Sequence, residues 1–319
     1  MLLEVQNLTK IFTSGLIGGY QVRAVDNVTF SIKEGEIVSL VGESGSGKTT
    51  IGKLILRLIK PTSGKILFKG EDIWSFDKDK LMNYYYKNVQ AVFQDPFASF
   101  NPLYKVDRVF DLVFRTFLKN VSDVEKDELV RRALESVGLN PREILGKFPH
   151  QLSGGQLQRI LIARALLVEP SLLIADEAVS MLDASTRIDV LNLLGEFRDN
   201  HGTSVIFITH DLALGYYISD KIIIMYRGSI VEWGDTEKVF DNPLHPYTKM
   251  LLESVPDLNV KWEFKGIEPE REEGKVWELK GCKFAPRCSL AKDKCWKIRP
   301  EPVEVEKNHW VACHLYGGS

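Results

Sequence analysis

The first 281 residues of this 319-residue chain contain no cysteine. The chain also lacks any apolar run near the roughly 20 residues that a membrane-spanning helix needs. Its longest candidates, Ile37–Val41 and residues 205–208, are strand-sized. The N-terminus has no basic region followed by an apolar stretch, so we expect no secretory signal. The net charge of −2 gives no electrostatic argument for nucleic acid as a partner. Together these absences predict a cytosolic protein.

All four cysteines lie in positions 282–319, spaced Cys282-x5-Cys288-x6-Cys295-x17-Cys313. Four thiols in a reducing compartment suggest a metal more than disulfides. The spacing lacks the C-x2-C pairs that are typical of structural zinc. An iron–sulfur cluster, zinc, and unmetallated or oxidised thiols therefore stay open as interpretations. We interpret the nearby His309 and His314 as packing or solvent residues and not as ligands.

The first half of the chain changes from strand-like to helical patterns. Short β-type runs come first, at residues 24–32, 36–41 and 65–68. A helix-rich segment follows, from about residue 91 to about residue 168. Within it, Ser122 and Glu125 form a capping-box pattern, and apolar residues then recur at helical spacing up to Gly138.

Strand-like patterns return in the second half. Residues 171–177, 204–210 and 221–228 are continuous apolar runs, which suit a parallel sheet covered on both faces. Because helical stretches such as residues 187–198 separate them, the predicted fold class is α/β in βαβ order. The segments at 222–226 and 230–233 predict a hairpin. A polar stretch from about residue 256 to about residue 274 predicts a solvated linker before the cysteine-bearing tail.

The strand Ile37–Val41 runs directly into a glycine-rich loop, residues 42–49, with the pattern G-x-x-x-x-G-K followed by Ser or Thr. Glycines let backbone N–H groups turn inward around phosphates, Lys48 would place a positive charge on them, and the Thr49 hydroxyl would coordinate Mg²⁺. A helix that begins near Lys48 directs its positive end at the same anion. The pattern predicts a nucleoside triphosphate site formed by Gly42, Ser44, Gly45, Ser46, Gly47, Lys48, Thr49 and Thr50.

Two further motifs narrow the class of nucleotide-binding protein. An apolar strand ends in Asp176 and Glu177. The first acid can hold Mg²⁺ and the second can polarise an attacking water. Residues 152–156 read LSGGQ, with Ser153 as the N-cap of a helix that Pro170 stops. This helix supplies a second N-terminus suited to an anion.

In their order along the chain, these motifs resemble the ABC ATPase family over about residues 1–250. Gln94 resembles that family's lid-region glutamine, Asp183 lies in a segment that resembles the loop crossing to the partner subunit, and His210 resembles the switch histidine. The resemblance implies a P-loop NTPase fold with a RecA-like core and a helical subdomain at about residues 91–168. An ABC nucleotide-binding domain would then span residues 1–250, and a small Cys-rich extension would span residues 251–319.

The resemblance also implies how the site works, since in this family two subunits close head to tail around each ATP. Ser153 and Gly155 would contact the partner's nucleotide, within a nucleotide-binding set that also includes Gly154, Gln156 and Asp183. Glu177 would be the general base, His210 would contact the γ-phosphate, and Gln94 would sense Mg²⁺ and water. The implied Mg²⁺ site consists of Thr49, Gln94 and Asp176.

An aromatic residue near the N-terminus should stack on adenine. Phe12 fits best by position, and Tyr20 is the alternative because the insert between them is longer than usual. The chain departs from the family pattern at Ala178, where proline is usual, and at Met181, where alanine is customary. Both positions lie where the partner's loop packs.

Residues 94–102 and 242–256 resemble the ATPases of oligopeptide and dipeptide importers, and four-cysteine members of that branch look like carriers of a 4Fe–4S cluster. The implied function is ATP-driven uptake of peptides through two membrane permease subunits, with an extracytoplasmic substrate-binding protein and no nucleic acid. The chain would sit peripherally on the cytoplasmic face of the membrane. Oligosaccharide or nickel cargo is one alternative, and a soluble non-transport ABC ATPase is another. Pairing with an identical copy or with a paralogue stays open.

Overall fold

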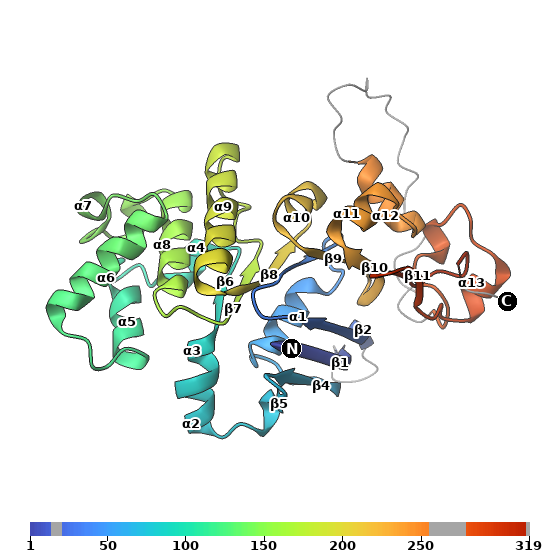
Figure 1. Cartoon of the computed structure of the whole chain (residues 1–319), viewed down its shortest axis with the longest axis horizontal. Coiled ribbons are helices and arrows are strands. Elements are labelled where there is room, and N and C mark those ends of the chain that lie inside the picture. Colours follow the sequence, from blue (N-terminus) through green and yellow to red (C-terminus); the bar gives the residue numbers. More distant parts are fainter. Residues whose placement is uncertain (14–20, 255–278, 317–319) are drawn as a thin grey trace.

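A computed structural model describes residues 1–13, 21–254 and 279–316 of the chain. The predicted linker at about 256–274 and the alternative stacking residue Tyr20 lie outside these described residues. In the described part, strands and helices alternate in the order expected of an α/β protein (Figure 1).

The larger sheet of the described residues begins with β11 (Val303–Glu306), β12 (His309–Val311) and β10 (Ser229–Asp235), followed in order by β9, β3, β8, β7 and β6. Its parallel part consists of β9 (Lys221–Tyr226), β3 (Ile37–Val41), β8 (Ser204–Thr209), β7 (Leu172–Asp176) and β6 (Val89–Val92). Side chains of β8 alternate between two cores, since Val205 and Phe207 belong to one and Ile206 and Ile208 to the other. The expectation of a parallel sheet covered on both faces is therefore confirmed.

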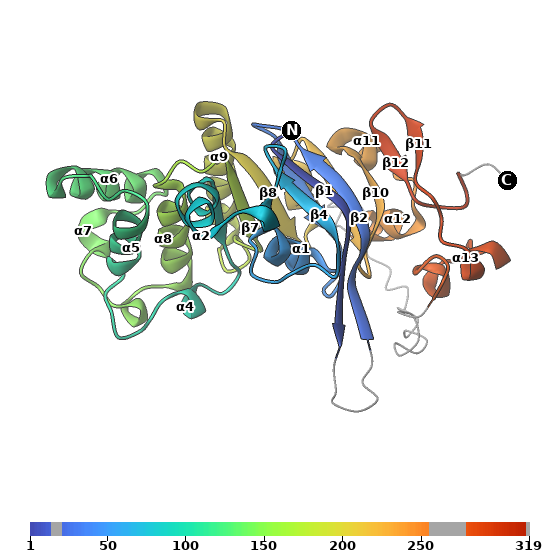
Figure 2. The ribbon, with the colours of Figure 1, turned by 90° about the horizontal axis from the view of Figure 1, so that it is seen from below.

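A second, antiparallel sheet packs over one face of the first (Figure 2). Its order is β2 (Gln21–Ile32), β1 (Leu3–Thr13), β4 (Ser63–Phe68) and β5 (Glu71–Asp72). The helix α1 (Lys48–Ile55) lies between the sheets and buries Ile51, Leu54 and Ile55 in the shared core. The end of the phosphate loop, where α1 begins at Lys48, is thus fixed between two sheets.

The middle of the chain forms short turns and then a group of helices at one end of the molecule (Figure 1). A 3₁₀ turn (Ile73–Ser75), α2 (Lys78–Lys80), a π-helical turn (Leu81–Tyr85) and α3 (Tyr86–Asn88) precede β6. The group comprises α4 (Pro96–Ser99), α5 (Arg108–Thr116), α6 (Asp123–Ser136), α7 (Pro141–Ile144), a 3₁₀ turn (Pro149–Gln151) and α8 (Gly154–Leu166). Ser122 and Glu125 form both halves of the predicted capping box. The expected start of the helical segment near residue 91 falls inside β6.

The last part of the chain extends the larger sheet. After α9 (Ala184–His201), α10 (Leu212–Ile218), α11 (Thr236–Asp241) and α12 (Pro246–Glu253), the cysteine-bearing segment forms a 3₁₀ turn (Ala285–Arg287), α13 (Asp293–Lys297), β11 (Val303–Glu306) and β12 (His309–Val311). β12 pairs antiparallel with β10 (Ser229–Asp235), and Trp233 stacks on Trp310 with ring centroids 5.7 Å apart. The hairpin predicted from residues 222–233 is present as β9 and β10.

Among the helices of the described residues, none combines the length and the apolar character that crossing a bilayer requires.

Candidate functional site

The glycine-rich loop joins the buried strand β3 to α1 at the carboxyl edge of the parallel sheet. Gly47 is the N-cap of α1 and has φ +101. A Cβ at this position would lie 2.2 Å from the carbonyl oxygen of Ala24, so only glycine fits without moving backbone. The N-terminus of α1 has no side-chain cap, which leaves its N–H groups available to an anion.

The Lys48 ammonium folds back over the loop. It donates to the carbonyl oxygens of Gly42 at 2.6 Å and Glu43 at 2.9 Å, and to the Ser46 hydroxyl at 3.3 Å. Burial lowers the pKa of Lys48, while the negative charges of Glu177, Asp176 and Glu43 oppose that shift. Three carboxylates therefore surround a buried cation at the predicted phosphate site.

Thr49 and Asp176 lie at the ends of α1 and β7 that meet beside the loop. The Thr49 hydroxyl donates to the Asp176 carboxylate at 3.1 Å. Burial raises the pKa of Asp176, while the Thr49 hydrogen bond and the charge of Lys48 oppose the rise. A hydroxyl and a carboxylate placed together are the oxygen ligands that Mg²⁺ prefers, so this part of the site fits the expected ion.

Glu177 and His210 follow adjacent parallel strands, β7 and β8. The His210 Nδ1 atom lies 3.2 Å from the Glu177 Oε1 atom. Glu177 has φ +49, an uncommon conformation for a residue with a side chain, and its N–H donates to the Ile208 carbonyl at 2.9 Å. Such strain persists where surrounding structure enforces it, and it is common at functional sites.

The structure places the other expected residues in more open positions. Gln94 is exposed just after β6, the strand next to β7. Phe12 is 43% exposed on β1, opposite Val22 of β2, and the Lys10 ammonium lies 5.1 Å from its ring centroid. Ala24, also on β2, lies against Gly47 of the phosphate loop. The exposed Phe12 ring therefore belongs to the strand pair β1–β2, which borders that loop.

The LSGGQ segment forms the N-terminus of α8. Ser153 and Gln156 form both halves of a capping box: Gln156 N–H donates to the Ser153 hydroxyl at 3.2 Å, and Ser153 N–H donates to the Gln156 side chain at 2.9 Å. Gly154 and Gly155 are partly exposed in the first turn. In both views α8 lies apart from α1, the helix that follows the phosphate loop of the same chain (Figures 1 and 2).

Asp183 caps its own helix, α9. Its carboxylate accepts from the Thr186 N–H at 3.0 Å, the Ser185 hydroxyl at 2.6 Å and the Thr186 hydroxyl at 2.7 Å. These bonds hold its pKa well below the usual range of a carboxyl. This local role comes in addition to the nucleotide contact expected from the sequence. The neighbouring Met181 is 55% exposed.

Sequence reasoning missed a set of contacts between the cysteine-bearing segment and the nucleotide core. Arg287 forms a two-point ion pair with Glu43, the second residue of the phosphate loop, at 2.8 and 3.1 Å. The Tyr247 hydroxyl accepts from the Glu43 N–H at 2.9 Å. The sequence does contain one signal for this contact, the acidic Glu43 inside an anion-binding loop. A carboxylate in that position is stable only with a cation nearby.

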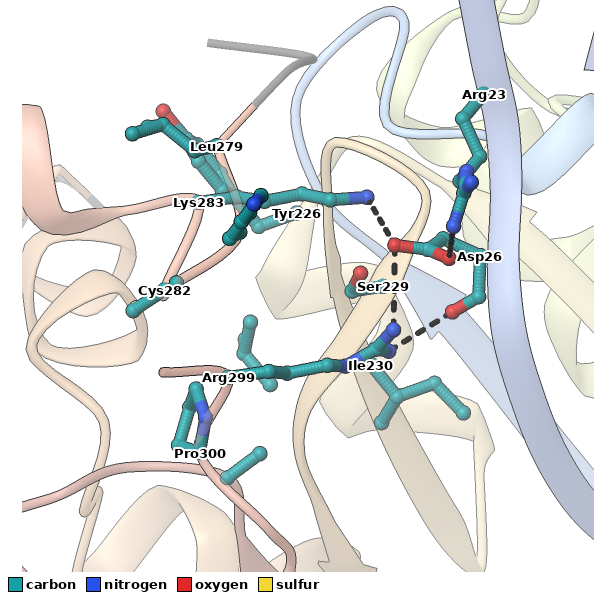
Figure 3. Close-up of a pocket in the computed structure, with 14 residues that line it drawn as sticks. Arg23, Asp26, Tyr226, Ser229, Ile230, Leu279, Cys282, Lys283, Arg299 and Pro300 are labelled. Carbon is teal, nitrogen blue, oxygen red and sulfur yellow. Dashed lines mark hydrogen bonds and ion pairs between the residues drawn. The ribbon is translucent and has the colours of Figure 1, made fainter. Parts of the chain in front are cut away.

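A second ionic contact lies beside a pocket of about 340 Å³ (Figure 3). Lys283, Arg299 and Arg23 converge on the carboxylate of Asp26, at 2.8, 3.2 and 3.0 Å. Burial alone would raise the pKa of Asp26, but these cations outweigh it and lower that pKa. Lys283 and Arg299 come from the cysteine-bearing segment, so this cluster joins the segment to β2.

The four cysteines are all free thiols. The Cys282 N–H donates to the Cys295 carbonyl at 2.7 Å, and burial raises the pKa of Cys282 to about 11, with smaller contributions from the other three sulfurs. Within residues 1–13, 21–254 and 279–316, however, no group of three or more His, Cys, Asp or Glu is arranged to hold a metal ion. The arrangement of the described side chains therefore does not support the metal centre expected from the sequence.

Comparison with known proteins agrees with the geometry of the loop. Residues 25–180 match the family model for the ABC transporter, and residues 231–295 match the model for the oligopeptide/dipeptide transporter, C-terminal region. The chain is 44% identical to the oligopeptide transport ATP-binding protein AppF of Bacillus subtilis, over 99% of this chain and 97% of that protein. It is 40% identical to the dipeptide transport ATP-binding protein DppF of Haemophilus influenzae, over 92% and 89%.

Solved structures of similar shape are ATP-binding cassettes. A dimeric post-hydrolysis state of the cassette MJ0796 bound to ADP and Pi has a TM-score of 0.67 at 30% identity, covering 73% of this chain and 98% of that chain. The structure of cbiO1 from Clostridium perfringens, part of the ABC transporter complex cbiONQ, has a TM-score of 0.64 at 28% identity, covering 76% and 91%. From its loop geometry and these similarities, we conclude that the chain belongs to the ABC transporter family and is an ATP-binding cassette ATPase with an oligopeptide/dipeptide transporter C-terminal region.

Proposed function

We propose that this chain binds and hydrolyses ATP at a head-to-tail dimer interface and thereby powers peptide uptake through separate membrane permease subunits. The main supporting observation is the meeting of three strand ends: the phosphate loop after β3, Asp176 and Glu177 after β7, and His210 after β8. The carboxyl edge of a parallel sheet is the usual place for such a site. The peptide cargo is supported by the names of the relatives.

In the proposed binding step, the triphosphate takes the position that Lys48 and the loop N–H groups enclose. Lys48 then exchanges its bonds to the loop carbonyls for bonds to the phosphates. Thr49 and Asp176, with Gln94, would hold Mg²⁺, which neutralises phosphate charge when bound. Phe12 would stack on the adenine.

In the proposed hydrolysis step, Glu177 accepts a proton from a water molecule while the water oxygen bonds to the γ-phosphorus. The bond from that phosphorus to the bridging oxygen of ADP breaks. His210, 3.2 Å from Glu177, would orient the carboxylate and contact the γ-phosphate. Ser153 to Gln156 of a second subunit would close the site, since α8 stands apart from the loop of its own chain.

A Glu177→Gln variant tests the assignment of the base. We expect ATP to bind with near-normal affinity, while turnover falls by at least about 100-fold because the general base is lost. Glu196→Gln, at an exposed position of α9, is the matched control and should retain activity. Turnover of Glu177→Gln at the wild-type rate would show that the base lies elsewhere. In cells lacking this chain, the wild type should restore uptake of labelled peptides and Glu177→Gln should not.

We also propose partners and a location in keeping with this function: a second ATPase subunit, identical or paralogous, two permease subunits, and an extracytoplasmic binding protein that meets the permeases. The chain would sit on the cytoplasmic face of the membrane. An oligosaccharide or nickel cargo is the alternative, and uptake assays with those solutes discriminate between them.

We propose, from the sequence chemistry alone, that Cys282, Cys288, Cys295 and Cys313 bind a 4Fe–4S cluster, with zinc as the alternative. Four thiols are a suitable donor set, although their side chains do not form such a site in the described structure. Anaerobically purified wild type should contain iron and absorb visible light, and Cys288→Ser should lose both. Ser289→Ala, one residue along, should keep them. Stoichiometric zinc without iron would overturn the cluster.

A further inference from the structure

The phosphate loop contains one acidic side chain, Glu43, and that side chain is held from outside the loop. Arg287 approaches it with both terminal nitrogens, at 2.8 Å to Oε2 and 3.1 Å to Oε1. Two parallel charge-assisted bonds fix the direction of the carboxylate as well as its charge. Arg287 belongs to the 3₁₀ turn directly before Cys288, so the contact joins residues 244 positions apart.

The backbone of Glu43 is held at the same point. Its N–H donates to the Tyr247 hydroxyl at 2.9 Å, and its carbonyl accepts from Lys48 at 2.9 Å and from the Ser46 N–H at 3.2 Å. The Tyr247 ring is buried against Tyr226 and Phe284, with centroids 4.7 and 5.4 Å away. Glu43, whose carbonyl positions Lys48, is thus held by α12 through its N–H and by the cysteine-bearing segment through its carboxylate.

The ion pair between Arg287 and Glu43 affects the charge that a bound nucleotide meets. A triphosphate in the loop brings several negative charges close to the Glu43 carboxylate. Without a cation, that carboxylate would repel the ligand and would also compete for Lys48, whose ammonium already lies against the Glu43 carbonyl. Arg287 removes both effects because it neutralises the carboxylate and turns it toward α12 and the C-terminal region.

We propose that Arg287 is a positioning residue of the phosphate loop: it holds and neutralises the Glu43 carboxylate, so that the affinity for ATP depends on the C-terminal region. This inference rests on the proposed nucleotide site at Lys48. It assigns to the C-terminal region a part in nucleotide binding that is separate from any metal.

The test is a charge-rescue series measured by MgATP binding and steady-state ATPase assays. Arg287→Gln should weaken binding by about 10-fold or more, the range expected when an unpaired carboxylate repels a nearby triphosphate. It should raise KM with little change in kcat, since Arg287 does not touch the attacking water. Glu43→Gln alone should change binding little. The double variant Glu43→Gln/Arg287→Gln should bind nearly as well as wild type, because no unpaired carboxylate remains.

Two further variants complete the series. Arg287→Lys keeps the charge but loses the two-point geometry, and it should fall between wild type and Arg287→Gln. Arg131→Gln, which removes an arginine paired with Glu128 and Glu135 on α6, should bind ATP as wild type does.

The outcomes separate the inference from the function on which it rests. If Lys48→Ala binds MgATP as tightly as wild type, the proposed nucleotide site is wrong. If Lys48→Ala loses binding but Arg287→Gln does not, the site stands and the inference fails. The inference also fails if the double variant binds as weakly as Arg287→Gln, since that result assigns Arg287 a structural role unrelated to the charge of Glu43.

Discussion

At the scale of single residues, the site depends on a few positions whose backbone conformation is closely constrained. Glu177 keeps a positive φ although it has a side chain, and its N–H bond to Ile208 fixes it at the strand end. Gly47 abuts the carbonyl of Ala24 so closely that a methyl group cannot enter. These contacts restrict the backbone of the loop and of the strand end beside it, which reduces the conformational entropy that ligand binding costs.

Gly47 and Gly45 offer a matched pair to test this rigidity, since both have positive φ, +101 and +77. Alanine at position 45 meets nothing within 4 Å. It should cost only the conformational strain of about 1 kcal/mol. Gly47→Ala also forces the Ala24 carbonyl to move. It should lower the free energy of unfolding by about 3 kcal/mol or more and weaken ATP binding. Urea unfolding measures the free energy of unfolding of both variants. An equal loss of that free energy in the two variants would contradict a role for the Ala24 contact.

At the scale of elements, β12 completes the larger sheet by a buried ionic contact. Glu232 on β10 accepts from His309 of β12 at 2.8 Å and from the N–H groups of Leu244 and His245 at 2.9 and 2.7 Å. Both Glu232 and His309 are fully buried. This contact ties β10, β12 and the start of α12 together, close to Tyr247 and the phosphate loop.

The contact predicts a pH dependence of stability. Burial lowers the pKa of His309, but Glu232 and Glu306 outweigh it and raise that pKa above its ordinary value. Burial lowers the pKa of the neighbouring His245 to about 4, so His245 stays neutral near pH 7. A raised histidine pKa stabilises the fold fully below the unfolded value, and the contribution is lost as pH rises through the folded value.

Urea unfolding of wild type and His309→Gln, from about pH 6 to about pH 9, checks this prediction. The variant should be less stable by about 1 to 3 kcal/mol at the acid end, because Glu232 loses its partner. The difference in free energy of unfolding between wild type and His309→Gln should become smaller toward the alkaline end, where His309 loses its proton. A difference that stays constant or widens with pH would contradict a protonated His309.

Much of the fold and of the proposed site could be predicted from local patterns. The continuous apolar runs around Ile174, Phe207 and Ile223 indicated a parallel sheet, and the loop, Asp176 and Glu177 followed from motifs. The Glu43–Arg287 and Glu232–His309 pairs could not be predicted, because they join residues 244 and 77 positions apart and depend on how the cysteine-bearing segment packs on the rest of the chain. The four cysteines differ from the rest of the site, since four clustered thiols predicted a metal site that the arrangement of the described side chains does not support.

At the scale of the whole molecule, the two halves of the proposed nucleotide site lie on different parts of the chain. The phosphate loop is in the sheet core, while the LSGGQ segment is on α8 in the helical group (Figures 1 and 2). A related cassette, MJ0796, is dimeric in a post-hydrolysis state. We therefore infer that a working site takes Lys48 from one chain and Ser153 from another.

Complementation between two inactive variants tests whether the site is shared between two chains. Lys48→Ala and Ser153→Arg should each hydrolyse ATP far more slowly than wild type. In a mixed dimer, one site has both defects, and the other combines an intact Lys48 with an intact Ser153 from the opposite chain. We predict that mixing the two variants restores ATPase activity. A mixture as inactive as its components, beside an active wild type, would contradict a site shared between two copies of this chain.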